Sequence, residues 1–450
     1  MIKDYPNYYD DIIKSISQLV QIPTLYDAAS ITDKMPYGKK VYEGYEWLKK
    51  KALEDGFEVL EFDGHALAIR IKGFITENRI DVVSHMDVVE PGEGWSEDPF
   101  SGSITKEYIY GRGTQDMKGA LILTYYALKF MKENQVSCKN ELRVVFGCDE
   151  ERTMEDMRYY IQKAGEPSFA FTPDGRFPFS LGEMGAIMWC VNGDAETCIE
   201  ELDGGVQCNV VSPIAYAFIH EIKNYHVYKE KIESGDYQGE VILDQDKLKI
   251  TIVGKASHAS RPEDGLNATV KLLELIQSVS KDPLATLLHQ CFCDSYGKGA
   301  GIDYDIENAG RLTLNLGILK ITDGKLMAQI DCRYPYGIAS SHLTDKIQKA
   351  LYPLEVSLKY DDKPTMSDSD SQYVKLLLNT YREITKDTFN EPFISGGVTY
   401  SKAIRNCVAF GPGLKDEVSL AHQANEKLDI KKIAPLFEIY LQTMIRLANL

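Results

Sequence analysis

Apolar side chains recur at helical spacing in two N-terminal segments, residues 8–20 and 41–53, and each segment predicts a helix. Residues 58–62 and 66–71 alternate between apolar and polar side chains around the turn pair Asp63-Gly64, which is the pattern of a β-hairpin. Residues 80–84 are rich in β-branched side chains, as buried strands are. The pattern therefore predicts two helices followed by three strands.

Strands and helices then alternate, with a helix predicted over residues 120–133, a strand over 141–146 and a helix over 155–163. Acidic residues or a histidine follow each predicted strand. His85 closes the first buried strand, Glu150 and Glu151 follow the next one, and Asp174 comes soon after the apolar residues 169–171. This arrangement predicts an α/β sheet whose functional site lies at the carboxyl edge of its parallel strands.

The regular alternation of predicted strands and helices ends near residue 185. Predicted strands at 186–191, 247–253, 312–321, 325–334 and 354–360 are mixed with predicted helices at 266–279, 284–291 and 341–351. The α/β alternation resumes after residues 361–364, which are charged and contain a proline. A chain of 450 residues is also longer than a single hydrophobic core usually accommodates. We therefore predict a catalytic domain formed by residues 1–185 and 365–450, with an α+β sandwich inserted as residues 186–364.

Charge and composition exclude several classes of partner. The formal net charge is −17 and no basic patch occurs, which argues against nucleic-acid binding. No apolar run reaches the length of a membrane span, and the first residues lack the apolar core of a signal peptide. The nine cysteines show no Cys-x-x-Cys spacing, so we expect reduced thiols and a cytoplasmic protein.

Two histidines and several carboxylates fall at the predicted sheet edge: His85, Asp87, Asp116, Glu150, Glu151, Asp174 and His422. So many acids would repel one another without a cationic centre. Two imidazoles together with bridging and terminal carboxylates suit a pair of divalent cations. Zinc and manganese both fit such a ligand set.

Five motifs occur in one order along nearly the whole chain: His85-x-Asp87, Gly113-x-x-Asp116-Met117-Lys118-Gly119, Asp149-Glu150-Glu151, Pro173-Asp174-Gly175 and His422-Gln423-Ala424-Asn425-Glu426. In these motifs the chain resembles the family of co-catalytic di-zinc peptidases and aminoacylases. Within that family it is most similar to the bacterial dipeptidase V branch, the Xaa-His dipeptidases of carnosinase type. The resemblance implies a zinc-exopeptidase-like catalytic domain with an inserted lid domain.

The resemblance also implies roles for the motif residues. One metal ion would be held by His85, Asp116 and Asp174, and the other by His422, Asp116 and Glu151, so that Asp116 bridges the two. Asp87 would hydrogen-bond to His85 and set its tautomer. Glu150 would act as the general base that takes a proton from a water held between the metal ions.

Further implied residues lie in or near the inserted domain. His258 would donate a hydrogen bond to the oxyanion of the transition state, and Arg333 would bind the substrate carboxylate with help from Asn209. Gly396 and Gly397 resemble the family's glycine loop, although Val398 stands where a third glycine is expected. The size of the insertion favours the dipeptidase V branch, in which the resemblance implies a monomer whose lid alone closes the site.

The sequence thus predicts a metal-dependent dipeptidase that acts on short unblocked peptides, β-alanyl dipeptides among them. Two alternatives stay open. The same machinery cleaves N-acyl amino acids, as in an acetylornithine or succinyl-diaminopimelate deacylase, and a non-catalytic metal-binding protein would share the ligands. Glu150 favours an enzyme, because Glu151 already supplies the carboxylate that metal binding requires.

Overall fold

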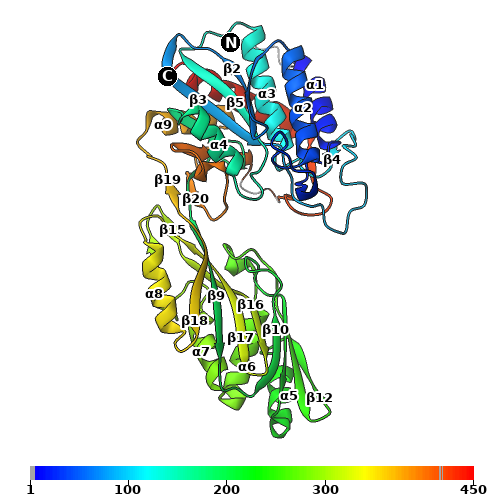
Figure 1. The fold of residues 1–450 in the computed structure, drawn as a ribbon, viewed down its shortest axis with the longest axis vertical. Coiled ribbons are helices and arrows are strands. Elements are labelled where there is room, and N and C mark those ends of the chain that lie inside the picture. Colours follow the sequence, from blue (N-terminus) through cyan, green and yellow to red (C-terminus); the bar gives the residue numbers. More distant parts are fainter. Residues whose placement is uncertain (1–5, 415–416, 418) are drawn as a thin grey trace. The chain divides into compact units, whose positions relative to one another are not determined.

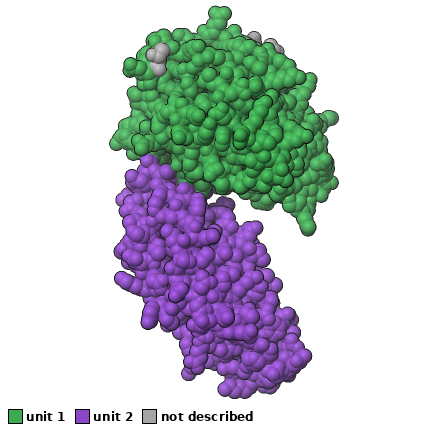
Figure 2. Space-filling view, in the orientation of Figure 1, with its two compact units in different colours: residues 1–182, 367–393, 398–450 green, residues 183–366, 394–397 purple. Residues whose placement is uncertain are grey.

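The computed structural model describes residues 6–414, 417 and 419–450, and the chain forms two compact units (Figures 1 and 2). Unit 1 comprises residues 1–182, 367–393 and 398–450, and unit 2 comprises residues 183–366 and 394–397. The sequence-based division placed the changes after residues 185 and 364, and it assigned Gly396 and Gly397 to the catalytic domain. In the structure both glycines belong to unit 2.

A mixed sheet forms the centre of unit 1, with the strand order β1-β2-β5-β3-β6-β21-β8-β19, and β20 pairs with β8. The strand bounds are β1 Glu58–Phe62, β2 Ala66–Ile71, β3 Ile75–His85, β5 Asn140–Gly147, β6 Phe169–Thr172, β8 Ser180–Glu183, β19 Thr365–Met366, β20 Phe393–Ser395 and β21 Cys407–Ala409. The central strands β5, β3, β6 and β21 run parallel. Their carboxyl ends therefore lie at one edge, as the sequence predicted.

Helices cover both faces of this sheet. They are α1 Pro6–Val20, α2 Lys39–Glu54, α3 Lys118–Glu133, α4 Glu155–Ala164, α9 Gln372–Thr385 and α10 Ile433–Leu447. Val82 and Val144 point into the core shared with α1, α2, α3, α9 and α10, whereas Val83 and Val145 point into a second core with α4. The alternation of strand side chains thus divides the core into two layers.

Unit 2 is an eight-stranded antiparallel sheet with the order β12-β13-β11-β10-β16-β17-β9-β18. Its strands are β9 Gly185–Asp194, β10 Ile199–Gly204, β11 Ile214–Ile219, β12 Gly239–Asp244, β13 Lys247–Val253, β16 Thr313–Thr322, β17 Lys325–Tyr334 and β18 Glu355–Asp362. Its helices are α5 Tyr225–Glu233, α6 Ala268–Ser280, α7 Pro283–Phe292 and α8 Ser340–Ala350. One core joins sheet and helices, including Trp189, Ile250, Leu272 and Ile347.

Short elements complete the chain. Paired short strands are β4 Tyr108–Tyr110 with β23 Lys427–Asp429, β7 Gly175–Arg176 with β22 Pro412–Gly413, and β14 Asp305–Ile306 with β15 Gly310–Arg311. The 3₁₀ helices are η1 Ala28–Ser30, η2 Ile222–Asn224, η3 Pro262–Asp264, η4 Tyr400–Lys402 and η5 Ile430–Lys432. Through the described part of the chain, every helix is too short or too polar to span a membrane. Residues 1–5, which entered the signal-peptide prediction, lie outside the described residues.

The predicted α/β fold class with an α+β insertion is confirmed. The sequence pattern did not identify β4, β10, β11, β12 or α5. β12 is an edge strand with five of its six residues exposed, so its sequence carries little of the apolar alternation on which strand prediction relies.

Candidate metal centre

Six predicted site residues of unit 1 lie together, four of them at the ends of parallel strands. His85 is the last residue of β3, Glu150 and Glu151 follow β5, and Asp174 follows β6. Asp116 lies in the loop before α3, and His422 lies in the irregular segment before β23. Ligand atoms of His85, Asp116 and Glu151 lie within 4.8 Å of one another, as do those of His85, Glu150 and Asp174.

Asp116 lies between the two imidazoles. Its Oδ1 is 3.1 Å from His85 Nε2, and its Oδ2 is 3.1 Å from His422 Nε2. One carboxylate with an oxygen directed at each histidine has the arrangement that a bridging ligand requires.

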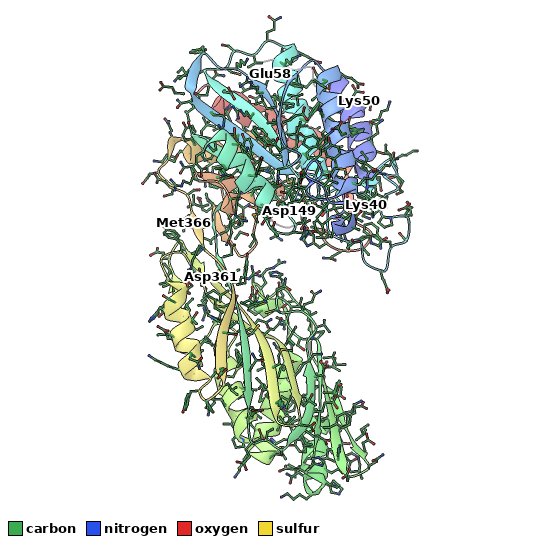
Figure 3. All side chains as sticks on the ribbon, in the orientation of Figure 1. Lys40, Lys50, Glu58, Asp149, Asp361 and Met366 are labelled. Atoms are coloured by element: carbon green, nitrogen blue, oxygen red, sulfur yellow. The ribbon has the colours of Figure 1, made fainter. Side chains whose placement is uncertain are left out.

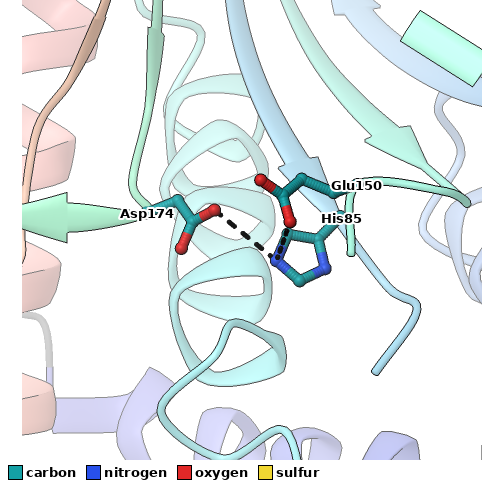
Figure 4. Close-up of side chains that lie close together, drawn as sticks. All are labelled: His85, Glu150 and Asp174. Atoms are coloured by element: carbon teal, nitrogen blue, oxygen red, sulfur yellow. Dashed lines mark ion pairs between the residues drawn. The ribbon is translucent and has the colours of Figure 1, made fainter. Parts of the chain in front are cut away.

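A second carboxylate accompanies each histidine. On one side Glu151 Oε1 lies 3.1 Å from His422 Nε2. On the other side Asp174 Oδ2 lies 3.6 Å and Glu150 Oε2 lies 3.8 Å from His85 Nε2, and all three side chains point toward one another (Figure 4). Because Glu151 accompanies His422, Glu150 is an additional carboxylate beyond the predicted ligand set.

The tautomer of His85 follows from its other ring nitrogen. Nδ1 lies 2.9 Å from the backbone carbonyl oxygen of Asp87, and a carbonyl can only accept a hydrogen bond. Nδ1 therefore carries a proton, and in the neutral ring Nε2 would present its lone pair to the carboxylates. A lone pair facing three carboxylates is unfavourable unless a cation lies between them, so the donor set fits divalent cations.

Asp87 approaches His85 with both its backbone and its side chain, since its carbonyl oxygen lies 2.9 Å and its Oδ1 lies 3.5 Å from His85 Nδ1, and its carboxylate has a second task. The Asp87 carboxylate accepts hydrogen bonds from the backbone N–H groups of Glu150 at 3.3 Å and Glu151 at 3.1 Å. One residue thus orients an imidazole and both glutamates of the neighbouring turn.

Burial and mutual repulsion shift the acid–base properties of the cluster. Burial and the neighbouring Asp116 raise the pKa of Glu151 to about 7, and burial with Asp174 raises the pKa of Glu150 well above its usual range. Hydrogen bonds to Asp116 and Glu151 raise the pKa of His422 to about 10. Without cations, protons must hold this cluster together near neutral pH.

Chelation is therefore expected to make stability fall with rising pH. The pKa of Glu151 is raised from 4.5 to about 7, so the folded chain holds this proton more tightly than the unfolded chain. The contribution of protonated Glu151 to stability is fully present below pH 4.5 and is lost as the pH rises through 7. His422, raised from 6.5 to about 10, stabilises below pH 6.5 and loses this contribution toward pH 10. Bound cations replace these protons. Between pH 5 and 8 the melting temperature should therefore fall further in chelator than with zinc, by roughly an additional 3 °C or more. Scanning fluorimetry measures both profiles, and parallel profiles would contradict the prediction.

Two buried residues that the sequence analysis assigned no role support the turn that carries Glu150. The Asp156 carboxylate accepts hydrogen bonds from the backbone N–H groups of Cys148 at 2.5 Å and Asp149 at 2.9 Å, and the hydroxyl of Tyr400 also donates to it. Asp149 is labelled in Figure 3, and its turn joins β5 to α4. The sequence signal for Asp156 was an acidic residue at the start of the predicted helix that follows the Asp149-Glu150-Glu151 motif.

Tyr400→Phe is expected to cost about 2 kcal/mol of unfolding free energy, because it removes a buried hydrogen bond to a carboxylate. It should also lower kcat by about tenfold or more, because the turn that holds Glu150 loses support. Tyr160→Phe is the matched control, since its hydroxyl donates to the buried Asp81 at 2.8 Å. Urea unfolding should give similar losses for both variants, and a similar kcat loss in the control would refute the positioning role.

Predicted residues of unit 2 also lie together. The Nδ1 of His258 is 2.7 Å from Ser260 Oγ and accepts from the backbone N–H of Ser260 at 3.1 Å. Since a backbone N–H only donates, neutral His258 carries its proton on Nε2. The backbone carbonyl of Asn209 accepts from Ala259 at 2.9 Å, which places Asn209 beside this loop.

Arg333 and Gly396 adjoin the His258 loop. A Cβ on Gly396 would lie 2.7 Å from the Cβ of Ser260, so only glycine fits there. The Gly396 carbonyl accepts from Arg333 Nη1 at 3.2 Å. Asp331 occupies the Nε and Nη2 edge of Arg333 at 2.9 and 3.0 Å. A substrate carboxylate would therefore have to use the other edge of the guanidinium.

The fold and the cluster in unit 1 define an α/β protein with a candidate divalent-cation site at its sheet edge. Residues 82–446 match the model of peptidase family M20/M25/M40, and the chain belongs to this family. This confirms the resemblance predicted from the motifs.

Relatives of known name align over almost the whole chain. "Putative dipeptidase YtjP" of Bacillus subtilis is 29% identical over 456 residues, with 98% of each chain covered. A protein of Staphylococcus haemolyticus with the same type of name is 28% identical over 464 residues, with 98% and 97% covered.

Solved structures share the fold. The M20 metallo-carboxypeptidase Sso-CP2 of Sulfolobus solfataricus matches with a TM-score of 0.58 at 19% identity, over 98% of this chain and 99% of that chain. Human carnosine dipeptidase 1 matches with a TM-score of 0.56 at 13% identity, over 98% and 97%.

Proposed function

We propose that this protein is a metal-dependent dipeptidase that hydrolyses the peptide bond of short unblocked peptides. The observation that carries the proposal is the position of Asp116 between two imidazoles, each accompanied by a further carboxylate. Glu150 lies beside this set without being one of the proposed ligands. The family supports peptidase activity, and two relatives aligned over 98% of this chain carry the name "putative dipeptidase".

Two divalent cations, zinc in the first place and manganese as the alternative, fit the ligand set. His85 and Asp174 would hold one cation, His422 and Glu151 the other, and Asp116 both. When bound, such cations lower the pKa of water and stabilise negative charge that develops on an amide oxygen.

Glu150 is proposed as the general base. It lies beside His85 but outside the proposed ligand set, and its burial favours uptake of a proton. Glu150 would take a proton from the attacking water and deliver it to the amine that leaves. Its neighbour Glu151 faces His422 instead, so the two consecutive side chains have separate tasks.

Unit 2 is proposed as the lid domain that supplies polar groups to the substrate. His258 Nε2–H would donate to the oxyanion, a role that its tautomer allows. Arg333 would bind the substrate carboxylate, Asn209 would assist, and the backbone of Gly396 and Gly397 would line the substrate. We also propose a cytoplasmic monomer, in line with nine cysteines that form no disulfide in the structure.

Hydrolysis of a substrate panel tests the function. The purified protein is stripped with chelator, restored with zinc or manganese, and assayed with an unblocked dipeptide, a β-alanyl dipeptide, an N-acetyl amino acid and N-succinyl-diaminopimelate. Metal-dependent cleavage of the free dipeptides alone is the expected result. Cleavage of the acylated compounds alone would make the protein a deacylase, and metal binding without any cleavage would leave a non-catalytic metal-binding protein.

A further inference from the structure

We infer that Glu426 is a positioning residue that fixes the distance between His422 and Asp116 and thereby sets the affinity of the cation on the His422 side. The inference rests on the proposed two-cation site. Glu426 itself has no exposed surface and is not among the ligands proposed above.

The Glu426 carboxylate receives four hydrogen bonds from the loop that carries Asp116. Oε1 accepts from the backbone N–H groups of Gln115 at 2.7 Å and Asp116 at 3.2 Å. Oε2 accepts from the backbone N–H of Gly113 at 3.0 Å and from Arg112 Nη1 at 2.7 Å. The backbone of the bridging ligand is therefore held directly by a carboxylate four residues after His422.

We call the contacts between residues 112–116 and residues 420–427 the junction. The side chain of Gln115 adds two hydrogen bonds to it. Its Oε1 accepts from the backbone N–H of Leu420 at 2.9 Å, and its Nε2 donates to the carbonyl of Lys427 at 2.8 Å. The Arg112 guanidinium also reaches the carbonyl of Gln423 at 3.3 Å. These contacts bracket His422 on both sides along the chain.

His422 depends on this junction more than His85 does. It lies in a segment without helix or strand, and its side chain is 53% exposed. Its backbone φ is +62°, in a region that residues other than glycine rarely adopt. His85, in contrast, ends a central strand of the sheet that pairs with strands on both sides. Loosening the junction should therefore displace His422 relative to Asp116 while the side of His85 and Asp174 keeps its geometry.

Zinc titration of the full-length protein tests this inference. Metal-free wild type, Glu426→Gln and Gln115→Ala are titrated in competition with a chromophoric chelator, and bound zinc is counted after dialysis. In Glu426→Gln we expect one of the two sites to weaken by about tenfold to a hundredfold, as for other residues that orient ligands, and the other to change by less than about threefold. Gln115→Ala removes only side-chain bonds of a half-buried residue, so it should fold and weaken the same site to a smaller degree.

Asp81→Asn is the matched control, because Asp81 is also fully buried and its partners, Arg79 and Tyr160, belong neither to the loop of Asp116 nor to the segment of His422. It should lower stability and leave both zinc affinities unchanged. Unchanged affinities in both junction variants, or equal weakening of both sites, would overturn the inference. Failure of the wild type to bind two zinc ions would instead overturn the proposed site itself.

Discussion

Glu150→Gln is expected to lower kcat for an unblocked dipeptide by between about 10² and 10⁴-fold while the cation content stays at the wild-type level. Glutamine keeps the size and the hydrogen-bonding oxygen of the side chain but cannot take up a proton. The proposed ligands do not include Glu150, since Glu151 is the glutamate that lies 3.1 Å from His422. Turnover should therefore fail although the cations are in place.

Steady-state kinetics and metal analysis of the same preparation check this prediction. Glu151→Gln, at the adjacent position, is the matched control, and it should lose cation on the His422 side as well as activity. KM should change little in Glu150→Gln, because the lost group acts on the proton in transit. Wild-type turnover in Glu150→Gln would remove the general base from the mechanism, and loss of metal would reassign Glu150 as a ligand.

Asp116→Asn is expected to reduce both cation binding and activity to background. The two oxygens of Asp116 lie 3.1 Å from His85 and His422, so one substitution alters the ligand sets of both proposed cations. Asp174 adjoins only the His85 side, at 3.6 Å. Asp174→Asn should therefore weaken one cation and leave the other, which makes it a control matched in chemistry.

Metal analysis after dialysis separates these cases. We expect fewer than one bound cation per chain in Asp116→Asn and close to one in Asp174→Asn, with thermal unfolding curves of both variants confirming a folded chain. Two cations retained in Asp116→Asn would contradict a bridging role. Equal loss in the two variants would mean that the cations bind only as a pair.

Local patterns in the sequence determined much of this protein. β-branched and apolar runs predicted β3, β5 and β6, and residues at the ends of parallel strands must meet at one edge, so His85, Glu150 and Asp174 could be brought together before any coordinates. Motif order extended the set to Asp116 and His422, which lie in loops without periodicity. The edge strand β12 escaped prediction because its three apolar residues, 241–243, are consecutive and mostly exposed, so they do not alternate with polar residues as strand prediction requires.

Only the tertiary structure decided how these residues are held. Glu426 reaches the loop of Asp116 across some 310 residues of chain, and Tyr400 reaches Asp156 across 244 residues. The structure also paired Arg333 with Asp331 and directed the Asp87 carboxylate to a neighbouring turn. Periodicity records which face of an element is buried, whereas a hydrogen bond between distant loops depends on how the whole chain packs. The sequence alone could therefore identify the candidate ligands, and the packed chain determined the contacts that orient them.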